Sequence, residues 1–382
     1  MNFDWSPEHI DFRARVRGFL DAHLPDDWGQ FSQSFDTGSD QVEAFSRNFC
    51  PKLAAEGLLV PHWPVEYGGQ GLDPWHHWIL NEEMFAAGEP RSYQYMSVNW
   101  AGPALIGFGT PEQKAAHLPG IARGELFYCQ GFSEPNAGSD LTALQTRAER
   151  DGDDFRINGS KIWTSAASFA NYCFLLARTG GPGRAGITLF IVPMDLPGIT
   201  VNVIKGLQGQ KAFHEVFFDD VRLPDTAVLG TVDGGWGVVG AILHNERIGV
   251  PRYSLTIRGL DRAMEILTAE GRADRPGVRS SATLARAACE AARLQCYGVI
   301  DARVKKRPPS AETSLARYAI VQADRLVADF LGEFLGDYII SGTDPVLNAA
   351  YRRSGSTGIA AGAAEIQLNA IARGWLELPS GR

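Results

Sequence analysis

The chain has 382 residues, of which 45% are hydrophobic and 21% are charged, and its formal net charge is −8. This length and composition predict an ordinary globular protein with two or three packed units, and they exclude a disordered chain. Nucleic-acid binding is disfavoured, because neutralising phosphates requires a concentrated basic face, and no basic run is longer than Lys305-Lys-Arg307.

The sequence carries no pattern of a membrane span or of an export signal. No apolar stretch approaches the ~20 residues that are needed to cross a bilayer. The first residues, Met1-Asn-Phe-Asp, lack the charged and apolar regions of a signal peptide. We therefore expect a cytoplasmic location.

Residues 1–125 carry the spacing of a helical domain. Ser6-Pro7-Glu8 predicts a helix start, because it supplies a hydroxyl cap, a proline at the first helical position and an acid in the first turn. The helix that follows should bury an apolar stripe made of Phe12, Val16, Phe19, Leu20 and Leu24. After an irregular connection at 25–41, further helices are expected near residues 41–56, 74–87 and 101–122.

No metal site is predicted. The five cysteines have no C-x-x-C spacing and predict reduced thiols packed in the core. His76 and His77 are adjacent, so their side chains point in different directions on a helix. We expect packing or surface roles for both histidines rather than metal binding.

From residue 126 onward, short runs rich in β-branched and aromatic residues replace the helical pattern. They are Phe127–Phe132, Phe155–Ile157, Ile162–Ser165, Tyr172–Ala177, Ile187–Val192, Ile199–Ile204 and Val216–Phe218. Turn residues separate them, and no helical pattern of about ten residues lies between them, which favours an antiparallel β-barrel or sandwich over a parallel βαβ topology. Asn158-Gly159 predicts a hairpin turn between the second and third runs.

The helical period returns after Gly234-Gly235. Two apolar stripes mark helix faces, namely Leu284, Ala288, Ala291 and Leu294, and later Leu315, Ala319, Leu326, Phe330 and Phe334. Pro308-Pro309 separates the two, which predicts an antiparallel four-helix bundle. The expected fold class is α+β with several domains: a helical N-terminal domain (1–125), an antiparallel β-barrel middle domain (126–231) and a C-terminal four-helix bundle (232–382).

A polar turn follows the first strand of the middle domain. Ser133, Gly138 and Ser139 offer hydroxyls and accessible N–H groups there, and such a turn can hold an anion or a carbonyl oxygen. The third run should carry Trp163 and Ser165 back towards this turn. An indole and a hydroxyl in that place suit a flat heterocycle.

These segments resemble the acyl-CoA dehydrogenase family, whose pattern is roughly T-E-P-x-A-G-S-D followed by N-G-x-K-x-W-I-T. The matching stretches are Phe132-Ser-Glu-Pro-Asn-Ala-Gly-Ser-Asp140 and Lys161-Ile-Trp-Thr-Ser165, with serine in place of the usual threonine at residues 133 and 165. Other stretches fall in family order: Gly109-Thr-Pro-Glu-Gln-Lys114 with Leu118-Pro119, Val221-Arg-Leu-Pro224, Gly234-Gly-Trp236 and Glu365-Ile-Gln367. The resemblance covers nearly the whole chain.

The resemblance implies α,β-dehydrogenation of an acyl-CoA thioester with FAD, in which a base removes the α-proton and the β-hydrogen leaves as hydride to flavin N5. The implied flavin contacts are Phe132 and Ser133 on the pyrimidine side, Trp163 and Ser165 on the N5 side, Gly138 and Ser139 near the CoA or the ring edge, and Gln130, whose position is often a tyrosine. Trp163 has an alternative role as a core residue of the barrel. Substrate contacts are implied for Ser139, Arg247 and Ala361.

Glu246 is the expected base. Many family members carry this glutamate in a Y-E-G-T segment near the C-terminus, where the chain has Ala361. Some branched-chain and long-chain members place it on the first helix of the C-terminal domain, directly before an arginine, which matches Glu246-Arg247. Alternatively, Glu246 is an exposed helix residue paired with Arg247 or with a neighbour four residues away, and Glu365, one helical turn beyond Ala361, is a rival base. The backbone N–H of Ala361 would still bind the thioester oxygen.

The clamp that many members use for the flavin pyrophosphate, R-x-Q-F-G with a downstream glutamine, is not recognisable at Glu270-Gly-Arg-Ala-Asp-Arg-Pro-Gly277. Either Arg272 or Arg275 is a substitute, or a partner chain supplies the clamp. The second case resembles the bacterial heteromeric dehydrogenases of sterol side-chain degradation, so homo-oligomer and heteromer with a related subunit both stay open.

The implied partners are an acyl-CoA with a branched, long or sterol-derived chain and an electron acceptor such as an electron-transfer flavoprotein. Two other functions stay open: a catalytically silent or accessory subunit of a heteromeric acyl-CoA dehydrogenase, and another flavin oxidase or monooxygenase on the same fold. The fold alone does not choose among the three functions.

Overall fold

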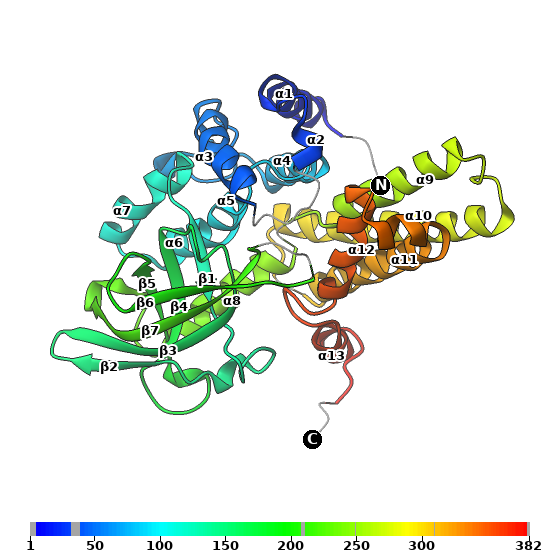
Figure 1. The fold of residues 1–382 in the computed structure, drawn as a ribbon. Coiled ribbons are helices and arrows are strands. Elements are labelled where there is room, and N and C mark those ends of the chain that lie inside the picture. Colours follow the sequence, from blue (N-terminus) through cyan, green and yellow to red (C-terminus); the bar gives the residue numbers. More distant parts are fainter. Residues whose placement is uncertain (1–4, 32–38, 208–210, 249, 309, 380–382) are drawn as a thin grey trace. The chain divides into compact units, whose positions relative to one another are not determined.

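The computed structural model describes residues 5–31, 39–207, 211–248, 250–308 and 310–379 (Figure 1). The chain forms two compact units. We call Met1–Phe35, Leu72–Pro90 and Glu246–Arg382 the helical unit, and Asp36–Gly71 and Arg91–Asn245 the sheet unit. Helices, then strands, then helices follow one another along the chain, which confirms the predicted α+β class. The domain boundaries at residues 125 and 231 stay a prediction.

The helical unit begins with α1 (Pro7–His23), which starts as predicted. The Ser6 side chain accepts a hydrogen bond from the N–H of His9, and Pro7 lies in the first turn. The buried residues of α1 are four members of the predicted stripe: Phe12, Val16, Phe19 and Leu20. After the single turn of α2 (Trp28–Phe31), the predicted irregular connection lies partly outside the described residues.

The next helix of this unit is α4 (Pro74–Ala86), which packs against α1. Two arginines of α1 pair with two acids of α4. Arg13 contacts both Glu82 and Glu83, and Arg17 contacts Glu83 at 2.7 Å. These acids are about 10% exposed, so the pairs join the two helices where water is largely excluded.

The rest of the helical unit is a bundle, as predicted. It consists of α9 (Tyr253–Ala269), α10 (Pro276–Val304), α11 (Glu312–Ser341) and α12 (Pro345–Thr357), with α13 (Ala364–Gly374) packed on α11. One cluster of buried apolar side chains runs through α9, α10, α11 and α12. In the described part of the chain, no helix is both long enough and apolar enough to cross a membrane.

The buried face of α10 differs from the predicted stripe. Leu284 and Leu294 are 64% and 50% exposed. The buried face consists instead of small side chains at helical spacing: Ala285, Cys289, Ala292 and Cys296. Small residues let α10 and α11 approach closely, so packing selects the less hydrophobic face. All five cysteines are free and buried, as predicted.

The sheet unit begins with α3 (Asp40–Ala55) and continues with short helices. α5 (Gln94–Met96) and a π-helical turn at Ser97–Ala101 lead into α6 (Gly102–Phe108) and α7 (Pro111–Ala122). The single helix predicted near residues 101–122 is therefore wrong. The break follows from Thr110, because its hydroxyl accepts from the N–H of Gln113 while the Gln113 side chain accepts from the N–H of Thr110. This capping box starts a new helix at Pro111.

In the described part of the chain, eight strands form one sheet, which Figure 1 shows. They are β1 (Tyr128–Gly131), β2 (Arg147–Asp151), β3 (Asp154–Ser165), β4 (Tyr172–Arg178), β5 (Ile187–Pro193), β6 (Ile199–Ile204), β7 (Phe213–Pro224) and β8 (Val228–Leu229). Their order is β6-β7-β3-β2-β4-β5-β8, and β1 pairs with β4. The pairs are antiparallel except β1 with β4 and one residue pair of β2 with β4. Within the described residues the edge strands β6 and β8 do not pair, so the predicted strands form an open sheet rather than a closed barrel.

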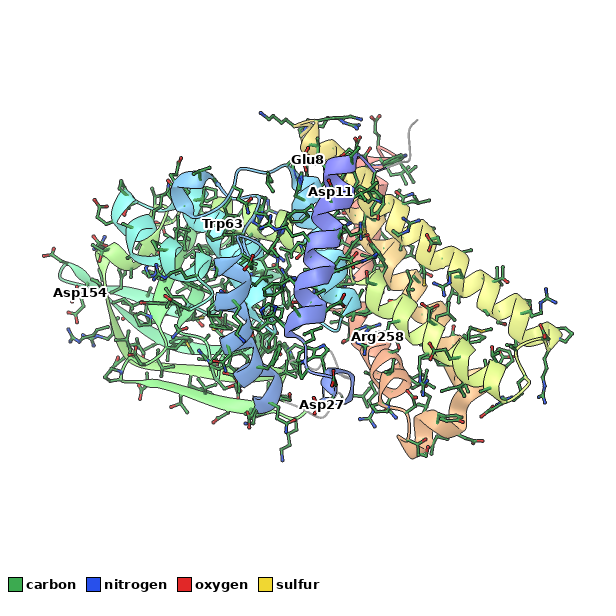
Figure 2. The ribbon with its side chains drawn as sticks, turned by 90° about the horizontal axis from the view of Figure 1, so that it is seen from above. Glu8, Asp11, Asp27, Trp63, Asp154 and Arg258 are labelled. Atoms are coloured by element: carbon green, nitrogen blue, oxygen red, sulfur yellow. The ribbon has the colours of Figure 1, made fainter. Side chains whose placement is uncertain are left out.

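The predicted hairpin turn at Asn158-Gly159 is wrong. Both residues lie inside β3, and the chain reverses between Asp151 and Asp154. Figure 2 labels Asp154 at one end of the sheet. A Cβ at residue 159 would lie 2.7 Å from the Cα of Thr146, so only glycine fits there. The side chain of Asn158 exchanges two hydrogen bonds of 2.9 Å with Asp220 of β7. The Asn-Gly pair therefore marks an irregularity in a continuous strand.

Candidate active site

Trp163 lies at a second irregular point of β3. The register of β3 against β7 shifts between Lys161 and Thr164. Trp163 has a φ of 60°, a left-handed conformation that few non-glycine residues adopt, and its side chain is 56% exposed. Its ring meets Phe213 edge-on, with 5.9 Å between the ring centroids. The alternative role of Trp163 as a core residue is therefore wrong, and a strained bulge that turns a side chain outward is typical of binding sites.

The polar turn after β1 lies against this bulge. The N–H of Ile162, the residue before Trp163, donates to the carbonyl oxygen of Ser133 at 2.9 Å. The predicted flavin contacts differ in burial: Phe132 is buried, Gln130, Ser133 and Ser165 are half-buried, and Gly138, Ser139 and Trp163 are exposed. The fold thus brings together Ser133 and Ile162, although β2 and most of β3 lie between them in the sequence.

A buried ion pair fixes the polar turn to β3. Lys161 is fully buried, and its ammonium group donates to Glu134 Oε1 at 2.7 Å and to the carbonyl oxygen of Phe132 at 3.2 Å. Glu134 also accepts from the N–H groups of Gln145 and Thr146, at 2.6 and 2.9 Å. These bonds join three segments of the sheet unit. Sequence reasoning missed both partners, although both stand within the stretches that carry the family resemblance.

The pKa values of both partners of this ion pair are lowered, but for different reasons. Burial lowers the pKa of Lys161 to about 8, and the attraction of Glu134 offsets only part of that effect. For Glu134, burial alone would raise the pKa, but Lys161 and the donors from Thr146 and Gln145 hold it below its ordinary value. The Glu134 carboxylate accepts several hydrogen bonds, which favour its charged form. The Lys161 ammonium is completely buried, which disfavours its charged form.

Unpaired polar atoms lie in the same sheet. Among the described residues, Gln130 Nε2, Thr164 Oγ1 and His214 Nε2 are buried and have no hydrogen-bond partner. Thr164 follows Trp163 and pairs with His214 across β3 and β7. Buried polar atoms are normally satisfied, so these atoms have capacity for a bound group. Together with the outward indole, they fit a flat heterocycle with polar edges, such as the flavin that the sequence implies.

Glu246 belongs to the helical unit and lies at the end of α8 (Gly235–Arg247). It is half-buried, so the alternative of an exposed helix residue is wrong. Burial lowers the pKa of Arg317 on α11 to about 10, and the charges of Asp324 and Glu246 oppose that shift. The charge of Glu246 therefore acts on this buried cation. The side chain of Arg247 lies outside the described residues, and the rival Glu365 is exposed in the first turn of α13.

Arg317 also holds the loop that carries Ala361. The guanidinium is fully buried, and its Nη2 donates to the carbonyl oxygens of Thr357 at 2.5 Å and of Ala360 at 2.7 Å. Ala361 and Gly362 follow with φ values of 53° and 90°. Within the described ranges, no backbone carbonyl accepts a hydrogen bond from the N–H of Ala361. The loop therefore has a fixed backbone donor with unused capacity, as binding of a thioester oxygen requires.

The proposed substitutes for the pyrophosphate clamp lie in different surroundings. Arg272 donates to Glu270 Oε2 and to the carbonyl oxygen of Phe334, each at 2.6 Å, so it already has partners inside the bundle. Arg275 is exposed directly before α10. Of the two arginines, Arg275 has the side chain better placed to contact another molecule.

We expect Arg317→Lys to slow flavin reduction by a thioester roughly 10²-fold, because a shift of about 1 Å in a reacting group has that effect. Lysine keeps the charge but lacks the rigid planar group whose Nη2 donates to both carbonyl oxygens. The flavin content should not change. Stopped-flow absorbance would measure the rate, with Asp329→Asn on the exposed side of α11 as the control. An unchanged rate would remove the role of Arg317 in positioning the loop.

Family models match the chain in three consecutive parts. Residues 6–125 match the acyl-CoA dehydrogenase N-terminal domain, 129–221 the middle domain and 233–376 the C-terminal domain. Acyl-CoA dehydrogenase IpdE1 of Mycobacterium tuberculosis is 35% identical over 378 residues, which cover 97% of each chain. IpdE1 of Mycolicibacterium smegmatis is 34% identical over 388 residues, again 97% of each chain.

Solved structures show the same architecture. The Tcur3481-Tcur3483 steroid ACAD matches with a TM-score of 0.86 and 29% identity over 100% of both chains. The ChsE4-ChsE5 complex from Mycobacterium tuberculosis matches with a TM-score of 0.83 and 26% identity, also over 100% of both chains. A sheet domain between two helical domains, with these relatives, defines an oxidoreductase. The chain belongs to the acyl-CoA dehydrogenase family.

Proposed function

We propose that the protein is the base-bearing chain of an FAD-dependent acyl-CoA dehydrogenase, with Glu246 as the base. The observation that carries this proposal is the double role of Arg317. Its guanidinium has Glu246 as a charged neighbour and is bonded to the loop of Ala361. One buried cation thus links the proposed base to the proposed donor for the thioester oxygen, and all three residues lie in the helical unit.

The chemistry assigned to these residues is the removal of a proton next to a thioester carbonyl. As that proton leaves, negative charge develops on the carbonyl oxygen, so a fixed donor at this oxygen lowers the barrier. We assign the donor to the N–H of Ala361 and the proton acceptor to the Glu246 carboxylate. FAD, when bound, accepts the β-hydrogen as a hydride.

The flavin contacts are assigned to the sheet unit. They are Gln130, Phe132, Ser133, Gly138, Ser139, Trp163 and Ser165, with Ser139 also proposed for the substrate beside Arg247 and Ala361. The unpaired Gln130 Nε2 and the outward indole of Trp163 support this assignment. Lys161 and Glu134 act indirectly, since they hold the backbone of the turn.

We also propose a steroid-derived acyl-CoA as the substrate and a related chain as a partner. The Tcur3481-Tcur3483 neighbour is a steroid ACAD, and the ChsE4-ChsE5 neighbour is a complex. The partners that Arg272 already has inside the bundle support a second chain that completes the pyrophosphate site. An electron-transfer flavoprotein is the proposed electron acceptor.

Anaerobic flavin bleaching tests the function. The chain, expressed alone and together with a related subunit from the same genome, is titrated with a panel of acyl-CoAs of different length, branching and ring content. We expect bleaching by at least one thioester, strongest for a steroid-derived one. Bound flavin that no thioester bleaches but a nitroalkane or another oxidase substrate does would replace the dehydrogenase assignment. Bleaching that persists without this chain would make it an accessory subunit.

A further inference from the structure

Two histidines and an aspartate meet between the starts of α1 and α4. His9 comes from the first turn of α1, whereas Asp73 and His76 come from the start of α4, and all three belong to the helical unit. One possible ligand atom from each lies within 4.8 Å of the other two. We propose that His9, Asp73 and His76 bind a divalent transition-metal ion of the zinc class. This site is separate from the proposed dehydrogenase chemistry and does not depend on it.

The spacing of the ligand atoms suits such an ion. His9 Nε2 lies 3.3 Å from Asp73 Oδ2, and His76 Nδ1 lies 3.0 Å from Asp73 Oδ1. Zinc bonds to imidazole nitrogen and carboxylate oxygen are about 2.0–2.2 Å long, so neighbouring ligand atoms around one ion lie about 3.0–3.5 Å apart. The two imidazole rings are tilted against each other with 4.7 Å between their centroids. The cluster therefore needs little movement to close around an ion.

On each histidine, the ring nitrogen that faces away from the aspartate contacts a further side chain, as is typical of metal sites. Ser6 Oγ lies 2.9 Å from His9 Nδ1, and Glu8 Oε1 lies 3.6 Å from His76 Nε2. These two contacts favour ring orientations in which the opposite nitrogen of each imidazole is free for an ion. Figure 2 shows Glu8 at the N-terminal end of α1, where this contact occurs.

The aspartate is held by the backbone of α4. Asp73 Oδ1 accepts from the N–H groups of Trp75 and His76 at 2.8 and 3.2 Å, which fixes the carboxylate as the cap of the helix. In the part of the chain that the structure describes, His9 Nε2 is the only hydrogen-bond partner of its Oδ2.

Burial and charge point to the same class of ion. The side chain of His76 is 4% exposed, that of His9 15% and that of Asp73 41%, so the cluster is enclosed on one side and open to solvent on the other. Two imidazoles and one carboxylate suit zinc and its neighbours, whereas magnesium and calcium prefer oxygen ligands alone. An ion there would cross-link α1 to α4. The prediction of no metal role for His76 considered only its neighbour His77, because His9 lies far away in the sequence.

Cobalt binding tests the site, because Co²⁺ replaces Zn²⁺ and its visible absorption reports the ligands. The full-length protein, free of a histidine tag and treated with a chelator, is titrated with Co²⁺ and then with Zn²⁺. We expect saturation at one equivalent, displacement by Zn²⁺ and a higher melting temperature with Zn²⁺. His76→Gln should abolish all three effects. Asp73→Asn, which keeps a helix-capping side chain, should weaken binding by more than about 100-fold, the upper end of the effect of losing an outer contact.

His77→Gln is the matched control, because His77 is the adjacent histidine and contacts Asn81 instead of the cluster. It should bind Co²⁺ as the unchanged protein does. If His76→Gln is unfolded by circular dichroism, His9→Gln decides instead, since the side chain of His9 is closer to solvent. No saturable Co²⁺ absorption in the unchanged protein, or unchanged binding in a folded His76→Gln or His9→Gln, would overturn the site and leave a hydrogen-bonded helix cap.

Discussion

Glu246→Gln is expected to abolish bleaching of bound flavin by an acyl-CoA while leaving the flavin content unchanged. Glutamine has the shape of glutamate but cannot accept the α-proton. Loss of a general base slows a reaction by about 10²–10⁴-fold, so bleaching should fall to near the detection limit. Anaerobic stopped-flow absorbance would measure the rate, and the flavin spectrum would give the content.

Proton exchange separates the base from a residue that acts only on binding. With the unchanged enzyme in deuterated water, we expect deuterium to enter the α-position of a thioester that binds but is not oxidised, and Glu246→Gln should lose this exchange. Glu365→Gln is the matched control, because Glu365 is the rival acid and is exposed. If Glu365→Gln removed the exchange and Glu246→Gln kept it, the two roles would have to be reversed.

The features that the sequence predicted well depend on neighbours along the chain. Ser6 and Pro7 start α1 because a cap and its helix are separated by only a few residues. The strand at Ile199–Ile204 was predicted with the bounds that it has in the structure, since its turn residues and its alternation are local. The polar turn at Ser133 and the run with Trp163 meet as expected, through the hydrogen bond from Ile162 to Ser133, although the predicted hairpin is not what brings them together.

The features that could not be predicted from the sequence depend on contacts between segments that are far apart along the chain. Gly159 was predicted to form part of a hairpin turn. The structure shows instead that glycine is needed there because Thr146 occupies the space of a side chain. β2 was missed because it is charged at most positions and buries chiefly Ala148. The effect of the Glu246 charge on Arg317 joins two residues that are far apart in the sequence. No pattern within one helix predicts that Arg317 holds the loop of Ala361. The sequence therefore indicated this half of the proposed site only through the positions that match the family.

Lys161→Met is expected to destabilise the sheet unit by about 3–5 kcal/mol, the usual effect of removing one partner of a buried ion pair. The substitution leaves the Glu134 carboxylate, which is 7% exposed, without its cation. It also removes the donor to Phe132, so the polar turn keeps its backbone bond from Ile162 to Ser133 but loses both side-chain bonds from Lys161 that attach it to β3. Urea unfolding followed by tryptophan fluorescence would measure the change in the free energy of unfolding. Lys211→Met is the control, because its pair with Asp40 is exposed and should contribute less than about 1 kcal/mol.

The same variant tests the electrostatic origin of the effect through pH. The pKa of Glu134 lies below its ordinary value of 4.5 in the folded protein, so its contribution to stability is present above that pH and is lost as the pH falls through the lowered pKa. Without the Lys161 cation, the stability of the sheet unit should fall less steeply below pH 4.5. Lys161→Met combined with Glu134→Gln removes both charges and should recover part of the stability that Lys161→Met loses. If the double variant lost as much as the two single variants added together, the ion pair would not be what holds the polar turn beside Trp163.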